Sequence, residues 1–436
     1  MLIEFTVKNF RSIRDEALLS MVKGARKELE DTNVLQINDA PASLNPLLRS
    51  AVIYGSNAAG KTNLLRALAA MQSLVVGSHQ RPPNEALPVT PFLMSSKART
   101  SPSEFEIHFI VDKVRYQYGV AVDQQQVHEE WLFAFPKGKS QKWFHRERSP
   151  DQTGTQTKFG DKLKGEKELW ERVTRPNGLL LATAAQLNSE QLTPIYNWFA
   201  NKLKIAVGRE SWNQQPLFTI SLLEQQQQAR VLRFMQAADF AISGLSLREV
   251  DGEHLNAITQ NMPPQLKALL ASQPGSSKGM QILTQHQTQE GETIEMGLGD
   301  ESDGTQKMFC YAGPWMDTLA NGNVMIIDDL DSNLHPLQVQ HLVKMFHDPS
   351  QSPNGAQLIF STHETSILNQ NLFRRDQIWF CERDTDQATR LYSLSDFAVR
   401  KGTENIERGY LSGRYGALPF LREIPQTMVS SAGTMP

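Results

Sequence analysis

The chain has 436 residues and a formal net charge of −3, and 40% of its residues are hydrophobic. This length allows two or three domains, or one large domain with an insertion. The nearly balanced charge argues against a binder that relies on overall positive charge, so any contact with DNA would need a local basic patch. No run approaches ~18 uninterrupted apolar residues, and the N-terminus lacks the apolar region of a signal peptide. We therefore expect a soluble, cytoplasmic protein that has no contact with membranes.

The N-terminal part of the chain predicts strands around one helix. Residues 1–8 alternate between apolar and polar side chains, as a half-buried strand does. Residues 104–110, 114–120 and 131–135 predict an antiparallel meander. Residues 73–103 contain several prolines and little periodicity, and we expect them to form a loop.

One octapeptide matches the P-loop pattern G-x-x-x-x-G-K-[ST] without a mismatch. Its residues are Gly55, Ser56, Asn57, Ala58, Ala59, Gly60, Lys61 and Thr62. A short apolar strand over residues 51–54 precedes it, and residues 63–71 follow with helical apolar spacing. We therefore expect the loop and the helix N-terminus to hold the phosphates of ATP. Lys61 is expected to reach the β and γ phosphates, and the Thr62 hydroxyl to bind Mg²⁺.

The middle of the chain predicts mainly short helices. Helical apolar spacing appears over residues 167–173, 179–186, 192–203 and 222–242. The four glutamines at 225–228 are expected to form a solvated helix face. Strands follow at residues 245–250 and 281–285, and a hairpin turn at 289–292 leads into a strand over 293–298. No heptad pattern persists, so a long coiled coil is not expected.

Two later strands end in polar side chains that suit a nucleotide site. The apolar residues from 323 lead into Asp328 and Asp329. We expect Asp328 to hold Mg²⁺ together with Thr62, and Asp329 to orient or deprotonate the attacking water. The apolar strand from residue 357 ends before His363, which is expected to donate to the γ-phosphate. An exposed turn at the two aspartates, and a helix cap at His363, are the structural alternatives.

A second anion-binding end is expected at Ser302 and Gly304, which open a helix. A serine hydroxyl, a bare glycine backbone and a helix N-terminus together favour bound phosphate. The chain already has a P-loop for its own triphosphate. We therefore expect Ser302 and Gly304 to bind the nucleotide of another subunit, which predicts a self-associating chain with ATP between two copies.

These four motifs, in this order, resemble the ATP-binding-cassette head domains of the SMC and RecF type. The matching segments are residues 55–63, 301–305, 328–336 and 361–363. The resemblance implies an α/β fold, in which a mixed sheet with a P-loop core is joined by an antiparallel β lobe and a helical insertion. It divides the chain into two halves of an ATPase head, residues 1–148 and 276–436, and a largely helical insertion, residues 149–275. It also implies contacts to the nucleotide from Asn57, Asn63 and Arg11.

A narrower resemblance points to compact bacterial ATPases of the AAA15 type, found with abortive-infection and other anti-phage systems. It is carried by residues 91–92, 374–380 and 410–417. It implies an ATP-dependent switch that controls a partner effector, a nuclease encoded nearby. Asp329 departs from the wider superfamily, which usually has glutamate there. Because a catalytic group misplaced by ~1 Å can cost on the order of 100-fold in rate, we expect slow hydrolysis.

Two other functions stay open from the sequence. A nuclease of the overcoming-lysogenization-defect type would need a Toprim domain, and Asp384 and Asp386 form the only late D-x-D pair. A polar hairpin turn is the ordinary explanation of that pair, and too few residues follow it for a Toprim fold. A DNA-repair ATPase of the RecF type would bind DNA directly through C-terminal basic residues, although a solvated face with interleaved glutamates also fits. Those basic residues are Arg400, Lys401, Arg408 and Arg414.

Overall fold

The structure is a computed structural model that describes residues 1–36, 45–149, 154–208, 215–251, 278–398 and 405–419. A six-stranded sheet lies at its centre, with the strand order β11-β15-β16-β5-β17-β18. The first five strands are parallel, and β18 runs antiparallel to β17. The bounds are β5 Ser50–Tyr54, β11 Leu203–Ala206, β15 Val324–Ile327, β16 Gln357–Ser361, β17 Ile378–Arg383 and β18 Thr389–Ser393.

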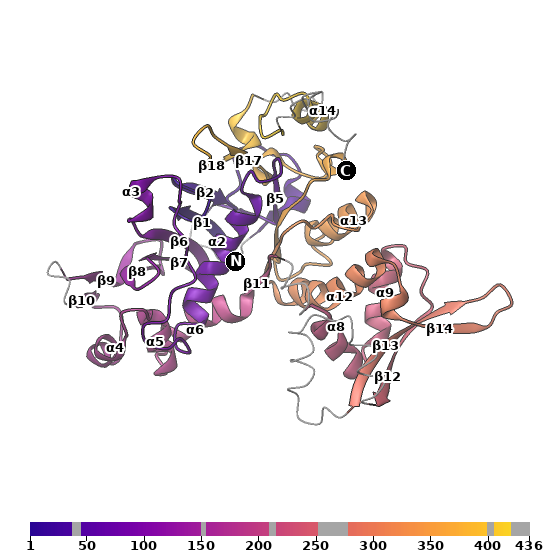
Figure 1. The fold of residues 1–436 in the computed structure, drawn as a ribbon, viewed down its shortest axis with the longest axis horizontal. Helices are drawn as coiled ribbons and strands as arrows, with labels where there is room; N and C mark the ends of the chain where they lie inside the picture. Colours follow the sequence, from indigo (N-terminus) through magenta and orange to yellow (C-terminus); the bar gives the residue numbers. More distant parts are fainter. Residues whose placement is uncertain (37–44, 150–153, 209–214, 252–277, 399–404, 420–436) are drawn as a thin grey trace, which may run out of the picture.

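A seven-stranded sheet forms a lobe beside the central sheet (Figure 1). Its order is β10-β9-β8-β7-β6-β1-β2, and all neighbours are antiparallel. The bounds are β1 Leu2–Lys8, β2 Ala17–Ser20, β6 Ser103–Val111, β7 Val114–Val122, β8 Val127–Phe135, β9 Gln141–Arg148 and β10 Thr155–Phe159. The expected meander is confirmed as β6, β7 and β8. A mixed P-loop sheet with an antiparallel lobe confirms the predicted α/β fold.

Side chains of the central strands alternate between two hydrophobic cores. In β5, Ala51 and Ile53 join the core shared with the lobe, whereas Val52 and Tyr54 join the core on the opposite face. Because successive side chains of a strand point to opposite faces, a strand buried on both faces is apolar throughout. This explains the uninterrupted apolar runs of the sequence.

Helices cover both faces of the central sheet. Helix α2 (Lys61–Val76) packs between this sheet and the lobe, where its side chains share one core with both. On the opposite face, α12 (Asp303–Asn321) and α13 (Pro336–His347) share a core with the sheet, and α9 (Gln228–Ala237) packs on α12. The P-loop therefore lies at the edge of a rigid layer, with packed helices on both sides.

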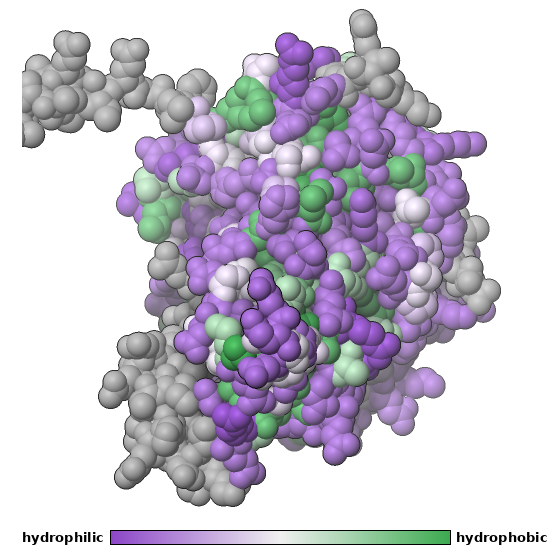
Figure 2. Space-filling model, turned by 90° about the vertical axis from the view of Figure 1, so that its right-hand side faces the viewer, coloured by the Kyte–Doolittle hydropathy of each residue, from purple (hydrophilic) through white to green (hydrophobic). Residues whose placement is uncertain are grey.

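A three-stranded antiparallel sheet lies on the α12 side, in the order β12-β13-β14. Its strands are β12 Gly244–Asp251, β13 Lys278–Gln287 and β14 Thr293–Gly297. This confirms the predicted strands and hairpin, and the β13–β14 hairpin projects from the body of the molecule (Figure 1). The side of the molecule from which it projects is mainly hydrophilic, with small separate hydrophobic areas (Figure 2).

Helix α12 contains a proline in its interior, and a threonine from α8 bridges the backbone pair beside it. Pro314 has no N–H group, so it interrupts the helical hydrogen bonds. The Thr219 hydroxyl accepts from Gly313 N at 2.9 Å and donates to Phe309 O at 2.8 Å. A Cβ at Gly313 would lie 2.7 Å from Thr219 N, so only glycine admits this approach. Thr219 thus satisfies the backbone groups Gly313 N and Phe309 O next to the proline.

The remaining elements are short and connect these layers. They are α1 Glu30–Asn33, β3 Val34–Leu35, β4 Leu47–Leu48, α3 Ser96–Arg99, α4 Lys167–Val173, α5 Leu180–Gln186, α6 Thr193–Asn197, η1 Trp198–Lys202, α8 Gln215–Glu224, η2 Leu298–Asp300, η3 Thr365–Ile367, η4 Arg375–Gln377, η5 Leu394–Asp396 and α14 Ile406–Leu411. Among the described residues, no helix is both long and apolar enough to cross a bilayer.

The described part of residues 149–275 differs from the expected helical insertion. Besides helices it contains β10, which extends the lobe, and β11, which forms an edge of the central sheet. Short strands paired at sheet edges are hard to recognise because their periodicity spans few residues. The expected helix face at the glutamines is also wrong, since Gln226 has φ 59° and forms a turn between α8 and α9. Residues 252–277 lie outside the described part.

Candidate nucleotide-binding site

The P-loop connects β5 to α2 through backbone conformations that require glycine. Gly55 has φ 151° and Gly60 has φ 109°. A Cβ at Gly55 would lie 2.3 Å from Cys381 O, and one at Gly60 would lie 2.0 Å from Thr389 Oγ1. Both glycines therefore let the loop pack against the C-terminal strands. Helix α2 has no side-chain cap at Gly60, so its first N–H groups face the loop as donors for an anion.

Lys61 lies under the loop and contacts the histidine expected to sense phosphate. Its Nζ donates to Gly55 O at 2.8 Å and to His363 Nε2 at 3.0 Å. Because an ammonium can only donate, His363 Nε2 is the acceptor in this contact. Burial lowers the pKa of Lys61, and Asp329, Cys381 and Asp328 partly offset that effect. A phosphate bound beside Lys61 would stabilise the charged form of this buried ammonium.

The two aspartates follow β15 and are held by a serine at the end of β16. The Ser361 hydroxyl donates to Asp328 Oδ1 at 2.6 Å and accepts from Asp329 N at 2.8 Å. Asp328 is buried, whereas Asp329 is half-buried and has φ 50°. Burial and the neighbouring Asp328 raise the pKa of the Asp329 carboxyl, and His363 and Lys61 oppose this rise. The parallel pairing of β15 with β16 therefore unites both motifs at one sheet edge.

His363 lies between Asp329 and the next aspartate of the same loop. Its Nε2 is 3.8 Å from Asp329 Oδ1. Its backbone N donates to the Asp331 carboxylate, with both oxygens at 3.3 Å. The side chain of His363 is therefore tied to Lys61 and its backbone to Asp331. This arrangement connects the P-loop to the loop that follows the two aspartates.

A cavity of about 480 Å³ brings most of the predicted residues together. Its predicted members are Ser56, Asn57, Ala58, Gly60, Lys61, Thr62, Asn63, Asp329 and His363. Gly55 lines an adjoining cavity, and Ala59 is buried beneath the loop, where its carbonyl accepts from Thr389 Oγ1. Asp328 lies behind Asp329, hydrogen-bonded to Ser361.

Three further residues line this cavity without having been predicted, namely Ser12, Arg66 and Arg383. Ser12 Oγ accepts from Asn63 Nδ2 at 2.8 Å, which joins the N-terminal turn to α2. Arg66 is an exposed residue of the first turns of α2, so the helical spacing after Thr62 could have identified it. Arg11 is not among the residues that line this cavity. Burial lowers the pKa of Arg11, and the nearby positive charge of Arg66 lowers it further.

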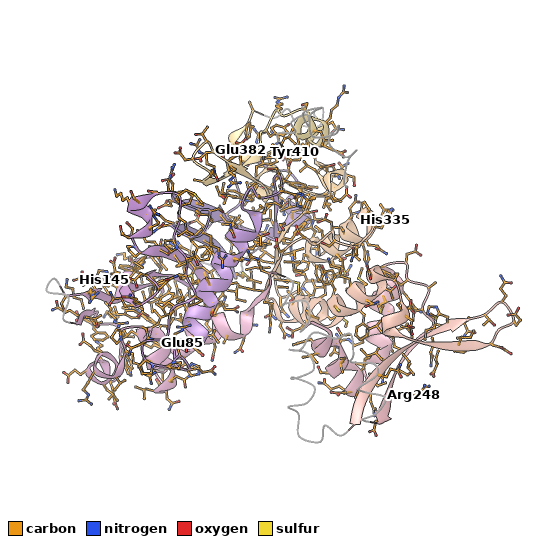
Figure 3. All side chains as sticks on the ribbon, in the orientation of Figure 1. Glu85, His145, Arg248, His335, Glu382 and Tyr410 are labelled. Carbon is orange, nitrogen blue, oxygen red and sulfur yellow. The ribbon has the colours of Figure 1, made fainter. Side chains whose placement is uncertain are left out.

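A neighbouring cavity of about 710 Å³ shares Ser56, Asn57, His363 and Arg383 with the first. It extends toward the C-terminal elements, where Glu382 and Tyr410, both labelled in Figure 3, line it. Because they have lining residues in common, the two cavities adjoin each other at the P-loop. Together they are large enough for a nucleotide and open to a second molecule.

Ser302 and Gly304 lie at the N-terminus of α12, outside both cavities. Ser302 is the N-cap of this helix, and its Oγ accepts from Thr305 N at 3.2 Å. Glu301 beside it accepts from Thr284 Oγ1 at 2.5 Å and contacts His286 Nε2 at 2.6 Å. The end of α12 is therefore anchored to the three-stranded sheet, and it does not reach the P-loop of its own chain.

The Asp384–Asp386 pair forms the turn between β17 and β18, as the structural alternative expected. Asp384 Oδ1 accepts from Asp386 N at 2.9 Å and from Ala388 N at 2.8 Å. Arg14 contacts the carboxylates of Asp384 at 3.6 Å and of Asp386 at 2.7 Å. Within the described ranges, no three His, Cys, Asp or Glu side chains converge as a metal site. Arg400 and Lys401 lie outside the described residues.

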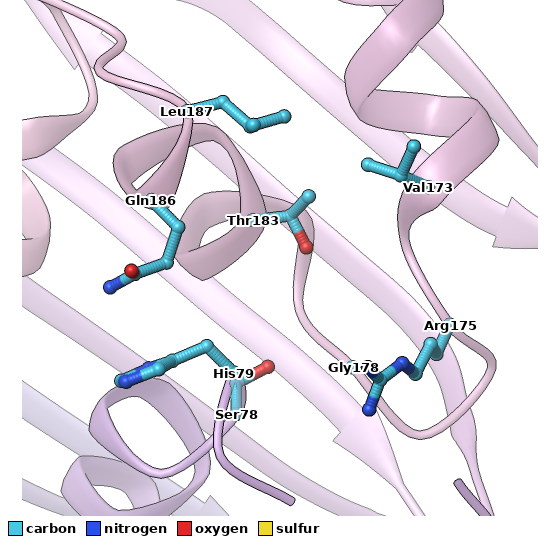
Figure 4. A pocket seen from close by; sticks show the side chains of 8 residues that line it. All are labelled: Ser78, His79, Val173, Arg175, Gly178, Thr183, Gln186 and Leu187. Carbon is cyan, nitrogen blue, oxygen red and sulfur yellow. The ribbon is translucent and has the colours of Figure 1, made fainter. Parts of the chain in front are cut away.

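A smaller cavity of about 180 Å³ lies near the C-terminal end of α2 (Figure 4). Its polar members have structural partners: Ser78 Oγ accepts from Leu179 N at 2.8 Å, and Arg175 Nη1 donates to Arg81 O at 2.9 Å. Thr183 Oγ1 donates to Leu179 O at 3.0 Å. These contacts fix the connection between α4 and α5, away from the P-loop.

Comparison with known proteins agrees with the geometry of the P-loop site. The sequence model of a family described as "AAA domain, putative AbiEii toxin, Type IV TA system" matches residues 50–369, which is most of the chain. The chain belongs to this AAA family. The match spans both the P-loop strand and the strand before His363, so a single family domain contains both of these motifs. No protein with a curated description matches the chain significantly.

Solved structures similar to this AAA-family chain include two SMC head domains. The SMC head domain from Thermotoga maritima is 12% identical, with a TM-score of 0.41, and the match covers 91% of this chain and 99% of that one. A second is the Smc head domain with an extended coiled coil bound to the C-terminal domain of ScpA, derived from Pyrococcus furiosus. It is also 12% identical, with a TM-score of 0.39, and the match covers 90% of this chain and 96% of that one.

Proposed function

We propose that the chain is an ATP-hydrolysing switch that closes as a dimer around ATP and thereby controls a partner effector, a nuclease, in anti-phage defence. The observation that carries the proposal is the convergence of Lys61, Asp329 and His363 on one cavity, while Ser302 and Gly304 of the same chain lie outside it. A second copy would bring its Ser302 and Gly304 to that cavity. ATP then lies between two chains, and hydrolysis separates them.

Oxygen ligands for Mg²⁺ are available at the site. Thr62 offers a hydroxyl in the cavity lining, and Asp328 offers a carboxylate whose second oxygen is not engaged by the Ser361 bond. Mg²⁺ commonly takes one or two protein oxygens and completes its shell with phosphates and water. The residues present therefore suit Mg²⁺ bound together with ATP, which neutralises phosphate charge.

Asp329 is the proposed residue that positions and deprotonates the attacking water. Its raised carboxyl pKa makes it a better proton acceptor than an ordinary aspartate. Its short side chain supports the slow turnover expected from the sequence. Slow hydrolysis suits a switch that persists in its ATP-bound state rather than a motor.

The defence role rests on the family and on the narrower AAA15 resemblance. The family description names a putative toxin of a toxin–antitoxin system, which is consistent with conditional growth arrest. Purifying the tagged chain from its native operon tests the partnership. We expect a co-purifying protein whose nucleic-acid cleavage changes with ATP, and loss of that control in Lys61→Met. Purification without a partner, or cleavage that ignores ATP, would contradict the proposal.

Direct DNA binding and intrinsic nuclease activity predict other outcomes. DNA binding by the isolated chain that weakens steeply with salt would favour a repair ATPase of the RecF type. Metal-dependent plasmid cleavage by the isolated chain, lost in Asp384→Ala, would favour the overcoming-lysogenization-defect type. We expect no cleavage, because the Asp384 and Asp386 carboxylates are already engaged by the hairpin turn and by Arg14.

A further inference from the structure

Lys307 connects the beginning of α12 to the loop beside the nucleotide cavity. It lies one helical turn after Gly304, and its Nζ donates to Ser332 O at 2.7 Å and to Asp329 O at 3.3 Å. Asp329 lines the cavity of its own chain, whereas α12 carries Ser302 and Gly304 at its N-terminus. One ammonium therefore bonds the helix to the backbone of the catalytic loop.

The position of this ammonium is fixed from several sides. Its charge lies 5.5 Å from the centre of the Tyr311 ring. Burial lowers the pKa of Lys307 to about 8, while Asp331 and Asp329 favour its charged form. A half-buried lysine that depends on protein carbonyls for solvation has little freedom to point elsewhere. The contact is a structural link rather than a passing surface interaction.

The loop on the other side of this link has a rigid shape. Asp329 and Asn333 both have positive φ angles, 50° and 59°. The backbone of Ser332 donates to Asp329 O at 3.1 Å, and its hydroxyl does so at 2.9 Å. Leu330 N donates to Ser361 O at 3.1 Å. A nucleotide that shifts the backbone at Asp329 would therefore move the loop as one unit, including the carbonyls that hold Lys307.

The helix responds at close range because it packs against the same loop. A Cβ at Gly304 would lie 2.8 Å from Asn333 O. The helix end is held on its other side by Glu301, which contacts Thr284 and His286 of β13. Any shift of the loop must therefore pass to the helix end through Lys307 and the Gly304 contact.

We propose that Lys307 is a positioning residue that transmits nucleotide occupancy of its own chain's site to Ser302 and Gly304, the residues offered to the partner's nucleotide. The inference deepens the proposed function and rests on it for the role of Ser302 and Gly304. ATP bound to one chain thereby sets how well that chain completes the site of the other, so the two sites are coupled through each Lys307.

The test compares amide hydrogen exchange over residues 302–306 with and without Mg²⁺ and a non-hydrolysable ATP analogue. We expect the analogue to change exchange there in the wild type but not in Lys307→Met, which keeps the aliphatic stem and removes the charge. Lys307→Arg should restore the response. Analogue affinity, measured at protein concentrations too low for dimers to form, should stay within about twofold in all variants, because Lys307 does not line the cavity.

Lys202→Met is the matched control, because Lys202 donates to Asn321 O at 2.8 Å at the far end of the same helix. It should respond as the wild type does. We also expect Lys307→Met to weaken analogue-dependent dimerisation by roughly 5- to 100-fold. An unchanged response at 302–306 in Lys307→Met, or no response in the wild type, overturns the inference. A wild-type response without any dimer contradicts the proposed function and leaves the in-chain link standing.

Discussion

At the scale of single residues, the candidate site combines a buried lysine with carboxyl groups beside the same cavity. Lys61 is buried with two carbonyls and one imidazole as its neighbours, and its pKa is lowered by burial. The Asp329 carboxyl, with its pKa raised, lies across the same cavity. A bound triphosphate with Mg²⁺ would supply negative charge beside the lysine and positive charge beside the carboxylates. These charges support the proposal that the site binds an anion accompanied by a cation.

Asp329→Asn should lower the rate of ATP hydrolysis by at least ~100-fold, because the amide cannot accept the proton of water. ATP affinity should change little, since phosphate binding rests on the loop and Lys61. Asp329→Glu should instead raise the rate if the short aspartate limits reach. Steady-state phosphate release measures both.

Asp317→Asn is a suitable control for these variants, because Asp317 lies on α12 and contacts Asn321 and Asn323 away from the cavity. It should hydrolyse ATP at the wild-type rate. Undiminished hydrolysis in Asp329→Asn would remove Asp329 from the mechanism.

Much of the site could be predicted at this scale and some of it could not. The P-loop, Asp328, Asp329 and His363 are marked by polar residues at the ends of apolar strands, a pattern visible in one dimension. Arg66 follows from the helical spacing after Thr62, whereas Ser12 and Arg383 line the same cavity but carry no local signal. Their roles depend on pairings between distant segments, such as Thr389 N to Ser12 O at 2.7 Å, which only the folded chain reveals.

At the scale of elements, two buried polar contacts between neighbouring elements should control stability. The first is Thr219 on α8, which bridges the proline break of α12. The second is His347 at the end of α13, whose Nε2 lies 2.8 Å from Ser50 Oγ on β5. Both contacts are buried, so the loss of a partner leaves polar groups without water.

Thr219→Val should destabilise the fold by about 2–4 kcal/mol, because it leaves Phe309 O and Gly313 N without their buried partner. Thr219→Ser keeps the hydroxyl and should cost clearly less. Urea unfolding followed by circular dichroism measures both. Equal stability of the valine and serine variants would show that the hydroxyl does not bridge the helix.

His347 should make the fold sensitive to mild acid. Burial, and to a lesser degree Arg49, lowers the pKa of His347 from 6.5 to about 3. The unfolded chain then binds a proton that the folded chain rejects, so stability is lost as the pH falls below 6.5. The loss is about 1.4 kcal/mol per pH unit from this group.

His347→Gln removes this titration and should lose less stability than the wild type between pH 6.5 and 5 when unfolding in urea is compared at each pH. The difference between the two proteins isolates His347 from the other titrating groups. Parallel pH profiles would contradict the buried neutral imidazole.

Helices and strands were predicted correctly where the apolar periodicity extends over many residues. They were missed where a short strand forms only by pairing with a distant segment. The helices at residues 167–173 and 303–321 and the lobe meander follow from apolar spacing over several turns or strands. Strand β11 has four residues, and its place beside β15 depends on parallel pairing with a segment more than a hundred residues away. The glutamine turn at 225–227 was missed because a left-handed residue ends α8 there.

At the scale of the whole molecule, the proposed site is divided between two copies. One chain provides the P-loop cavity, and the end of α12 in the same chain lies outside it. Each chain carries one P-loop cavity and one α12 end that do not meet within the chain. In a two-fold dimer, the cavity of each chain would meet the α12 end of the other, which forms two equivalent sites. The control of an effector would then follow from closing and opening of this dimer.

Mixing two inactive variants tests this central claim most directly. Lys61→Met lacks a functional P-loop but has an intact α12 end, and Ser302→Arg has the reverse. Each alone should hydrolyse no ATP. In an equimolar mixture, half of the dimers contain one complete site, so hydrolysis should recover to as much as about a quarter of the wild-type rate. A mixture no more active than either variant alone would contradict a site shared between two chains.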